Sequence, residues 1–361
     1  MANNNDKKVL NVPALRFPEF TGEWEIVSLK DIAVVNPKSE PLLNKFFYID
    51  LESVEKGELK KIQEILQEEA PSRAQRVISN NDILFQCVRP YQKNNYIHRV
   101  KNTSNIQWIA STGYAQIRTT ESPNYIYHLL NTDGFNRKVM VRCTGSSYPA
   151  INSEDLSAIR FYLSTDKKEQ CKIARLLDLL DERISTQNKI IEDLKKLKSA
   201  IVEMLLCNQS GEFFKLGDVG CYVRGLTYAN EDVTENKAAT IVIRANNLNY
   251  GSHVDKREVV YVNKTPTVSQ ILRKGDIVIC MANGSSALVG KNSYYPFNDR
   301  QSTIGAFCGI YRTSNPLVKW LMQSQRYKRQ VYQSLQGGNG AIANLNGDDI
   351  LNMSFPLTIV R

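Results

Sequence analysis

The most regular pattern of apolar positions lies in the middle of the chain, between residues 166 and 206. This stretch contains neither glycine nor proline, and eight of the ten a and d positions of one heptad frame are apolar. Those eight positions are Ile173, Leu176, Leu180, Ile190, Leu194, Leu197, Ile201 and Met204. Arg183 and Gln187 interrupt the frame, and such polar residues either fix the register of a partner helix or mark a break. The pattern predicts a coiled-coil helix of about 60 Å, which is too long for the core of one small domain.

The sequence on either side of this helix repeats itself with an offset of 194 residues. Residues 81–84 (NDIL) align with 275–278 (GDIV), and Phe161 aligns with Phe355. One offset that holds over more than 100 residues indicates two copies of one domain. We predict a first domain at 1–165, a spacer helix at 166–208 and a second domain at 209–361.

Four stretches within the copies predict strands, and two proline-led stretches predict helices. The strands are expected at 45–51, 82–88, 240–245 and 276–281, which are rich in β-branched and aromatic side chains. The helices are expected at 123–141 and 316–334, each with proline at its first position. We therefore predict an α+β fold in each copy, with a mixed, curved or barrel-like sheet and a few helices.

The composition is typical of a globular, cytoplasmic protein without a metal site. No run of 18 apolar residues is present, so no contact with a membrane is expected, and the first residues lack the apolar segment of a secretory signal. The seven cysteines are scattered singly without a C-x-x-C pair, and the three histidines are far apart. This pattern predicts free thiols in a reducing compartment and no zinc site.

The chain is basic, with a net charge of +9 and an isoelectric point near 9.0. Most of the excess lies in residues 207–361, which carry 17 basic and 11 acidic side chains. Residues 1–165 carry 20 and 18, and residues 166–206 carry 9 and 8. The nearly neutral helix suits pairing with protein, whereas the basic second copy favours a polyanion such as nucleic acid.

A loop at residues 283–293 (NGSSALVGKNS) resembles a phosphate-binding loop but departs from its pattern. Five residues rather than four separate Gly284 from Gly290, and Lys291 is followed by Asn292 instead of the Ser or Thr that ligates Mg²⁺. We interpret the loop as a polar connection between two strands. A nucleotide-dependent enzyme is the weakest alternative, and it predicts a thermal shift with ATP and Mg²⁺.

Together these features resemble the specificity subunit of type I restriction–modification enzymes. Residues 14–24 (ALRFPEFTGEW) resemble that family's entry into its first target recognition domain. Residues 145–184 (GSSYPAINSEDLSAIRFYLSTDKKEQCKIARLLDLLDERI) are similar to its passage into the conserved helix. The sequence carries no methyltransferase motif, no glycine-rich cofactor turn and no nucleophile with a nearby histidine.

The resemblance implies a non-catalytic subunit that binds double-stranded DNA. Each domain would read one half of a split target, and the helix would space the halves and dock modification subunits. Those subunits would bind S-adenosylmethionine and methylate a base, and restriction subunits would cut unmethylated DNA, so this chain would carry no cofactor. The family usually has a second long helix, whereas this chain ends at Arg361. We expect either a truncation or self-association through residues 173–204.

Side chains that contact DNA are expected on loops, where donors can reach base edges and phosphates. In the first domain the candidates are Arg89, Tyr91, Gln92, Lys93, Asn94, Asn95, Arg142, Ser146, Ser147 and Tyr148. In the second domain they are Arg224, Tyr228, Arg244, Asn246, Asn247, Asn283, Ser285, Ser286, Lys291 and Asn339. Each of these side chains could equally lie on an ordinary solvated turn.

A function of another class is compatible with the same pattern. A non-enzymatic scaffold or signalling protein, with tandem ligand-binding domains on a coiled coil, would also show a repeat around a long helix. Salt-dependent binding to duplex DNA together with a modification subunit discriminates between the two functions.

Overall fold

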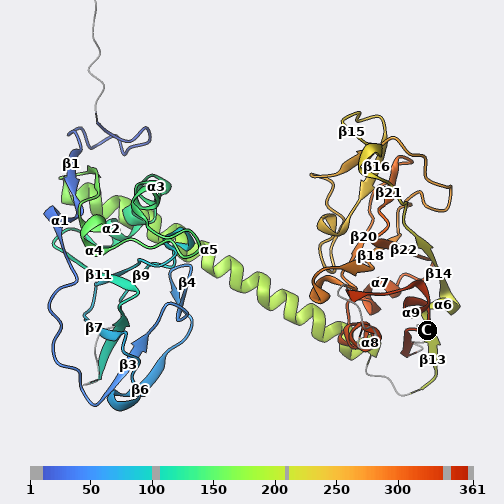
Figure 1. Ribbon diagram of the computed structural model, residues 1–361, viewed down its shortest axis with the longest axis horizontal. Helices are drawn as coiled ribbons and strands as arrows, with labels where there is room; N and C mark the ends of the chain where they lie inside the picture. The colour runs from blue at the N-terminus through green and yellow to red at the C-terminus, as the bar shows by residue number, and fades with distance from the viewer. Residues whose placement is uncertain (1–10, 100–105, 208–210, 336–342, 357–361) are drawn as a thin grey trace, which may run out of the picture. The chain divides into compact units, whose positions relative to one another are not determined.

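The computed structural model describes residues 11–99, 106–207, 211–335 and 343–356. The chain divides into two compact units, Met1–Gln187 and Asn188–Arg361, and the long helix contributes to both. Each unit consists of strands with short helices around them (Figure 1). The predicted fold class, two mixed α and β domains joined by a long helix, is confirmed. The domain limits near 165 and 208 stay predictions.

The first unit contains two four-stranded sheets. One is antiparallel throughout, in the order β2-β11-β8-β9, and the other, in the order β6-β3-β10-β7, contains the parallel pair β3 and β10. The strands of the first sheet are β2 (Ala33–Val35), β8 (Ile83–Gln86), β9 (Tyr96–Ile97) and β11 (Tyr114–Thr119). The strands of the second are β3 (Lys45–Ile49), β6 (Gln63–Leu66), β7 (Ala74–Ile78) and β10 (Gln107–Ser111). Two short antiparallel pairs join β1 (Glu25–Ser28) to β12 (Arg160–Leu163) and β4 (Val54–Glu55) to β5 (Glu58–Leu59).

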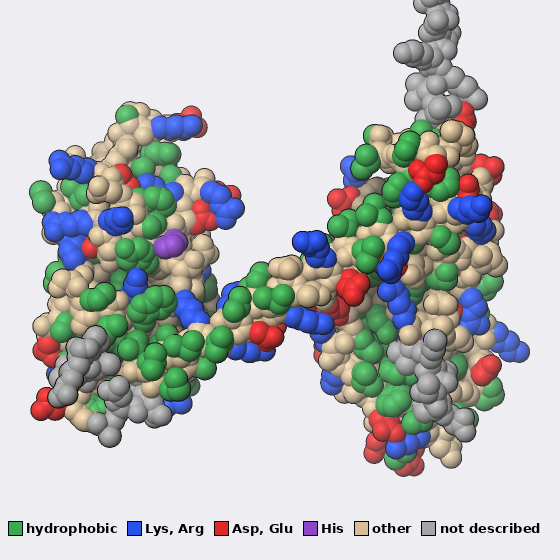
Figure 2. All heavy atoms as spheres, turned by 180° about the vertical axis from the view of Figure 1, so that it is seen from behind, with side chains coloured by type: hydrophobic (Ala, Val, Ile, Leu, Met, Phe, Trp, Pro, Cys, Tyr) green, Lys and Arg blue, Asp and Glu red, His purple; other side chains and the backbone are tan. Residues whose placement is uncertain are grey.

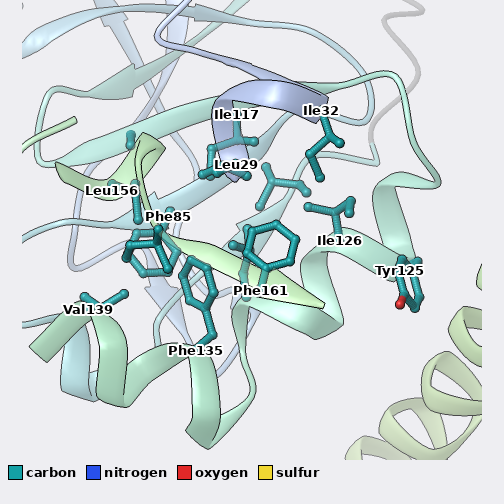
Figure 3. Close-up of a cluster of buried hydrophobic side chains, with 14 of the residues drawn as sticks. Leu29, Ile32, Phe85, Ile117, Tyr125, Ile126, Phe135, Val139, Leu156 and Phe161 are labelled. Atoms are coloured by element: carbon teal, nitrogen blue, oxygen red, sulfur yellow. The ribbon is translucent and has the colours of Figure 1, made fainter. Parts of the chain in front are cut away.

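Short helices pack on the antiparallel sheet and enclose the largest core of the first unit (Figure 3). These helices are α1 (Leu29–Ile32), α2 (Pro123–Leu130), α3 (Asp133–Arg142) and α4 (Ser153–Ser157). The rings of Phe85 and Phe161 pack edge-to-face on Phe135, with centroids 6.0 and 5.7 Å from it. Burial of each such side chain stabilises the fold by about 1.5–3 kcal/mol, so this cluster fixes α3 on the sheet.

The second unit again contains two four-stranded sheets. The order β14-β22-β18-β20 is again antiparallel, and the order β15-β17-β16-β21 again contains one parallel pair, β16 and β21. The strands are β14 (Gly220–Arg224), β15 (Val233–Thr234), β16 (Thr240–Ile243), β17 (Val260–Val262), β18 (Ile277–Cys280), β20 (Asn292–Tyr294), β21 (Ser302–Ile304) and β22 (Cys308–Thr313). Two further pairs join β13 (Phe213–Lys215) to β24 (Ser354–Pro356) and β19 (Ala282–Asn283) to β23 (Ala343–Asn344). The helices are α6 (Leu216–Val219), α7 (Val318–Leu321), α8 (Gln325–Leu335) and α9 (Gly347–Leu351).

The two units also share a buried ion pair at the offset of 194 residues. Arg118 donates from Nε and Nη2 to the carboxylate of Asp82 at 2.8 and 2.7 Å. Arg312 donates in the same way to Asp276, at 2.8 and 2.7 Å. Both carboxylates are almost fully buried. The repeat read from the sequence therefore corresponds to equivalent side-chain bonds between neighbouring strands.

Each proline-led stretch that was expected to form one helix forms two. In the first unit, the Asn131 amide donates to a carbonyl at the end of α2, and the Thr132 hydroxyl accepts the N–H of Phe135 at 3.2 Å. In the second unit, the Ser324 hydroxyl accepts the N–H of Tyr327 at 3.1 Å between α7 and α8. Side-chain caps of this kind end one helix and begin the next, which apolar spacing alone does not show.

The central helix, α5 (Lys167–Val202), continues as a π-helical turn, η3 (Glu203–Cys207), in agreement with the range expected from the heptads. Among the described residues, no helix combines the length and the apolar character needed to cross a membrane. Nor do the His, Cys, Asp and Glu side chains of the described ranges gather in a group of three that could hold a metal ion.

Candidate nucleic-acid interface

In the first unit, two of the candidate loops lie against each other. After β8 the chain makes a 3-10 turn, η2 (Pro90–Gln92), flanked by Arg89 and Lys93 with φ of 55° and 53°. This left-handed conformation is costly for residues other than glycine, so surrounding contacts must hold it. The N–H of Arg89 donates to Pro149 at 2.8 Å, and its guanidinium lies 4.2 Å from the centre of the Tyr148 ring. Arg89 thus joins the two loops.

A network of amides supports this turn from inside. The Gln86 side chain donates to Gln92 at 2.9 Å and accepts the N–H of Asn94 at 3.2 Å. Asn95 is buried, accepts the N–H of Gln86 at 2.8 Å and donates to Asn131 at 2.9 Å. The side chains of Gln92 and Asn95 therefore hold the loop in shape, and a role for them in reading bases stays a prediction.

Other candidate side chains of the first unit are at the surface. The Lys93 ammonium bonds to Asp133 at 2.5 Å, and this hydrogen bond lowers the pKa of the Asp133 carboxyl. Tyr91 and Tyr148 are 50% and 63% exposed. The remaining exposed candidates are Gln92, Arg142, Ser146 and Ser147. The accessible groups of this region are therefore aromatic, basic, amide and hydroxyl side chains around the stacked Arg89.

In the second unit, several candidates meet at the turn between β21 and β22, residues 305–307. Glycine is required where the chain after β14 crosses this turn, because a Cβ on Gly225 would lie 2.1 Å from the carbonyl oxygen of Gly305. A Cβ placed on Gly305 would lie 3.6 Å from the Tyr228 ring and 3.9 Å from Arg244 Cγ. Arg224, at the end of β14, precedes the crossing and is exposed. The fold thus brings these three candidates to one turn.

The loop that begins at Asn283 starts beside the same turn. The N–H groups of Met281 and Ala282 both donate to the carbonyl of Phe307, at 2.8 and 3.2 Å. Ser285 is exposed, and its N–H donates to the Asn283 side chain at 3.0 Å. Phe307 itself is 68% exposed. Sequence reasoning missed this residue, although alignment of the two copies places it opposite Gly113.

The resemblance of this loop to a phosphate-binding loop does not extend to its backbone. The N–H of Gly290 donates to Cys280 at 2.8 Å, and that of Lys291 donates to Leu288 at 3.2 Å. These N–H groups are therefore already used in bonds to β18 and within the loop, and cannot cradle a phosphate. Ser286 and Lys291 instead line a largely apolar pocket of about 800 Å³ with tyrosines of α8.

The other second-unit candidates differ in accessibility. Asn247 is 2% exposed, and its amide donates to the carbonyls of Asp255 and Glu258 at 3.0 and 2.7 Å. It is therefore engaged inside the unit, whereas Asn246 is exposed. Asn339 lies outside the described residues.

The heptad positions of α5 are largely at the surface. Ile173 is the exception, because it packs against the core of the first unit. The other predicted positions, which are 42–63% exposed, are Leu176, Leu180, Ile190, Leu194, Leu197, Ile201 and Met204. Figure 2 shows hydrophobic side chains on the surface of this helix. The residues that bury α5 in the second unit, Val202 and Leu206, lie outside the heptad frame.

Two carboxylates, of the buried Glu169 and the partly buried Asp178, anchor the start of α5 in the first unit. Glu169 is fully buried, and it accepts two bonds from Arg16 at 2.5 and 2.8 Å and one from Trp24 at 3.2 Å. Burial raises the pKa of the Glu169 carboxyl, but hydrogen bonds from Arg16 and Ser164 outweigh this effect and leave the pKa below its ordinary value. Nine residues further along the helix, Asp178 accepts bonds from α2. The helix is therefore fixed to the first unit by charge.

Residues 21–196 match the family model of the type I restriction modification DNA specificity domain. The match covers 176 of the 361 residues, which is just under half of the chain. Among curated proteins, the type I restriction enzyme EcoKI specificity subunit of Escherichia coli (strain K12) is 31% identical over 144 residues. That match covers 37% of this chain and 30% of the relative, so it spans less than a third of the relative's length.

Two solved structures share the fold of this chain. The type I restriction–modification S subunit from M. genitalium has a TM-score of 0.57 at 14% identity, over 93% of this chain and 85% of that one. A chain from a structural study of complex assembly and conformational transition of the type I R-M system has a TM-score of 0.51 at 20% identity. That likeness covers 95% of this chain and 87% of the other. The resemblance drawn from the sequence is confirmed.

Proposed function

We propose that the chain is the DNA specificity subunit of a type I restriction–modification enzyme. Each unit binds one half of a split target in double-stranded DNA, and α5 sets the distance between the halves. The observation that carries this proposal is the repeat, because the units share an antiparallel sheet, a parallel strand pair and an ion pair but have different exposed loops. Two domains that bind different half-sites need the same fold with different loops, because binding residues lie mainly on the loops that a fold positions.

The exposed loop side chains have the chemistry that this role requires. In the first unit, the Tyr148 ring holds the guanidinium of Arg89, which leaves its N–H fork for bidentate contact with guanine. In the second unit, Arg224 and Arg244 flank one turn. The basic excess of residues 207–361 attracts phosphates without regard to sequence. Side chains for contacts to DNA bases and a basic excess that attracts the DNA phosphates are thus both present.

The chain has no catalytic role in this proposal. Modification subunits bind S-adenosylmethionine and methylate the target, and restriction subunits cleave DNA that lacks the methyl group. The exposed apolar side chains of α5 support a docking surface for modification subunits, because a long row of exposed apolar side chains is typical of a protein-binding surface. Self-association through the same row is the competing use, and light scattering of the isolated chain at micromolar concentration distinguishes the two.

An R244A variant, assembled with the cognate modification subunits, tests the proposal. The wild-type complex should bind its target with an affinity that falls steeply between about 50 and 200 mM salt. R244A should cost about 1–3 kcal/mol and relax selectivity at one base pair. Arg257 is the matched control, because it is 88% exposed and paired with Asp255, so R257A should leave selectivity unchanged. Wild-type binding that ignores both salt and sequence would overturn the proposal.

A further inference from the structure

An aromatic ring stands on a rigid turn at the edge of the second unit's candidate interface. Phe307 lies between β21 and β22 and is 68% exposed. Its carbonyl oxygen accepts the N–H groups of Met281 and Ala282, and the turn closes with a bond of 2.9 Å from the N–H of Cys308 to Gly305. The backbone is therefore fixed from two sides while the ring remains accessible to solvent.

The first unit makes the same backbone contact without a side chain. Gly113, which lies 194 residues earlier, accepts the N–H of Cys87 at 3.0 Å, as Phe307 accepts that of Met281. A Cβ on Gly113 would lie 2.9 Å from the Leu51 side chain, so that position leaves no room for a ring. The first unit thus forms this turn without an aromatic residue, so the exposed ring of Phe307 is not needed for the turn to fold.

The turn that carries this ring has basic and aromatic neighbours. Tyr228 and Arg244 lie beside Gly305, two residues before Phe307, and Arg224 precedes the crossing of Gly225 over the same turn. An exposed apolar ring on a turn that also approaches arginines suits the surface of DNA, where charged backbones flank stacked bases. A protein partner would be better served by a contiguous apolar patch.

We propose that Phe307 inserts into a base step of the half-site bound by the second unit, while the neighbouring arginines hold the flanking phosphates. This inference rests on the proposed function and deepens it. Insertion unstacks one step and bends the duplex, and it favours flexible pyrimidine–purine steps. Because Gly113 occupies the equivalent place in the first unit, the distortion is confined to one half-site. Specificity at that step comes from the ease of unstacking rather than from a hydrogen bond.

The test uses the full chain in complex with its modification subunits, on target duplexes that carry 2-aminopurine at successive positions. The relevant half-site is the one at which R244A relaxes selectivity. The wild-type complex should raise 2-aminopurine fluorescence at one step of that half-site. F307A should abolish the rise and weaken binding roughly 5- to 100-fold, the range for one stacked base, whereas F307W should retain both. Y162A, which removes a 45% exposed ring from β12 of the first unit, is the control and should change neither.

The outcomes separate this inference from the proposed function. If the wild-type complex binds its target and F307A shows the same fluorescence, insertion is refuted while the specificity function stands. Weaker binding of F307A without a fluorescence difference refutes insertion as well, because Phe307 then contacts another surface. A wild-type complex that shows no preference for any duplex refutes the proposed function itself. Should F307A misfold, comparison of F307W with F307L, which keeps apolar bulk without an aromatic ring, decides the same point.

Discussion

The two Asp–Arg pairs offer a comparison of one mutation in two copies of the same fold. Asp276 is 2% exposed, and its partner Arg312 is 18% exposed and also donates to two backbone carbonyls. Asp82 is equally buried, but Arg118 is 46% exposed. Without Arg118, Asp82 would still accept a bond from Gln116 at 2.7 Å. The two arginines are therefore equivalent in sequence but unequal in environment.

Removal of one partner from a buried ion pair costs about 3–5 kcal/mol, because the remaining charge stays buried and uncompensated. We expect R312A to cost about 3–4 kcal/mol. Water and Gln116 compensate Asp82 in R118A, so the expected cost there is about 1–2 kcal/mol. For units of this size, each kcal/mol lowers the unfolding temperature by about 2–4 °C. The expected shifts are about 10 °C for the second unit in R312A and about 5 °C for the first unit in R118A.

Hydrogen exchange measured by mass spectrometry in increasing urea reports the two units separately, because each peptide belongs to one of them. R312A should accelerate exchange in peptides of residues 211–335, and R118A in peptides of residues 11–99. An R312K variant keeps the charge but loses the two parallel bonds, so its cost should be intermediate. Equal losses in R312A and R118A, or a larger loss in R118A, would refute the reasoning from burial.

Three further predictions concern the helix, the DNA and pH. Leu194→Glu should leave the unfolding temperature unchanged, because the side chain is 59% exposed. It should weaken the binding of modification subunits about tenfold or more in titration calorimetry, and unaltered binding would show that Leu194 is not part of the docking surface. K291A should weaken binding to all duplexes alike and reduce the slope of log affinity against log salt by about 1, and a change at only one base pair would contradict a phosphate contact. Burial raises the pKa of Asp299, but hydrogen bonds from Tyr295 and Lys256 outweigh it and lower the pKa to about 2. The wild type should therefore exceed D299N in stability by up to about 2 kcal/mol above pH 4 and lose this advantage as pH falls towards 2, and a difference in urea midpoints that does not depend on pH would contradict this assignment.

The long helix and the internal repeat could be predicted because both leave regular traces in the sequence. The heptads and the absence of glycine and proline define α5, together with its continuation η3, to within a residue or two. The offset of 194 residues reflects bonds that both copies make, such as those of Asp82 and Asp276. Strands β8 and β18 follow from their β-branched and aromatic residues.

The candidate site could be predicted only in part, because local sequence does not show which polar side chains are buried and hydrogen-bonded within the fold. Asn95 and Asn247 look like base readers, but both amides are buried and bonded within their units. The breaks between the paired helices depend on hydroxyl caps that apolar spacing conceals. Phe307 belongs to no recognisable motif. It becomes a candidate for DNA contact only once the structure shows that its turn matches the turn of Gly113 in the first unit.

The central claim is that each unit reads one half of a split target. Sequencing of methylated bases in a host that carries the chain with its modification subunits tests it most directly, with R244A measured beside the wild type. We expect a target of two defined halves separated by a spacer of fixed length, and R244A should relax one half while the other stays unchanged. Methylation at a single continuous motif, or a change in both halves from this one substitution, would contradict the account.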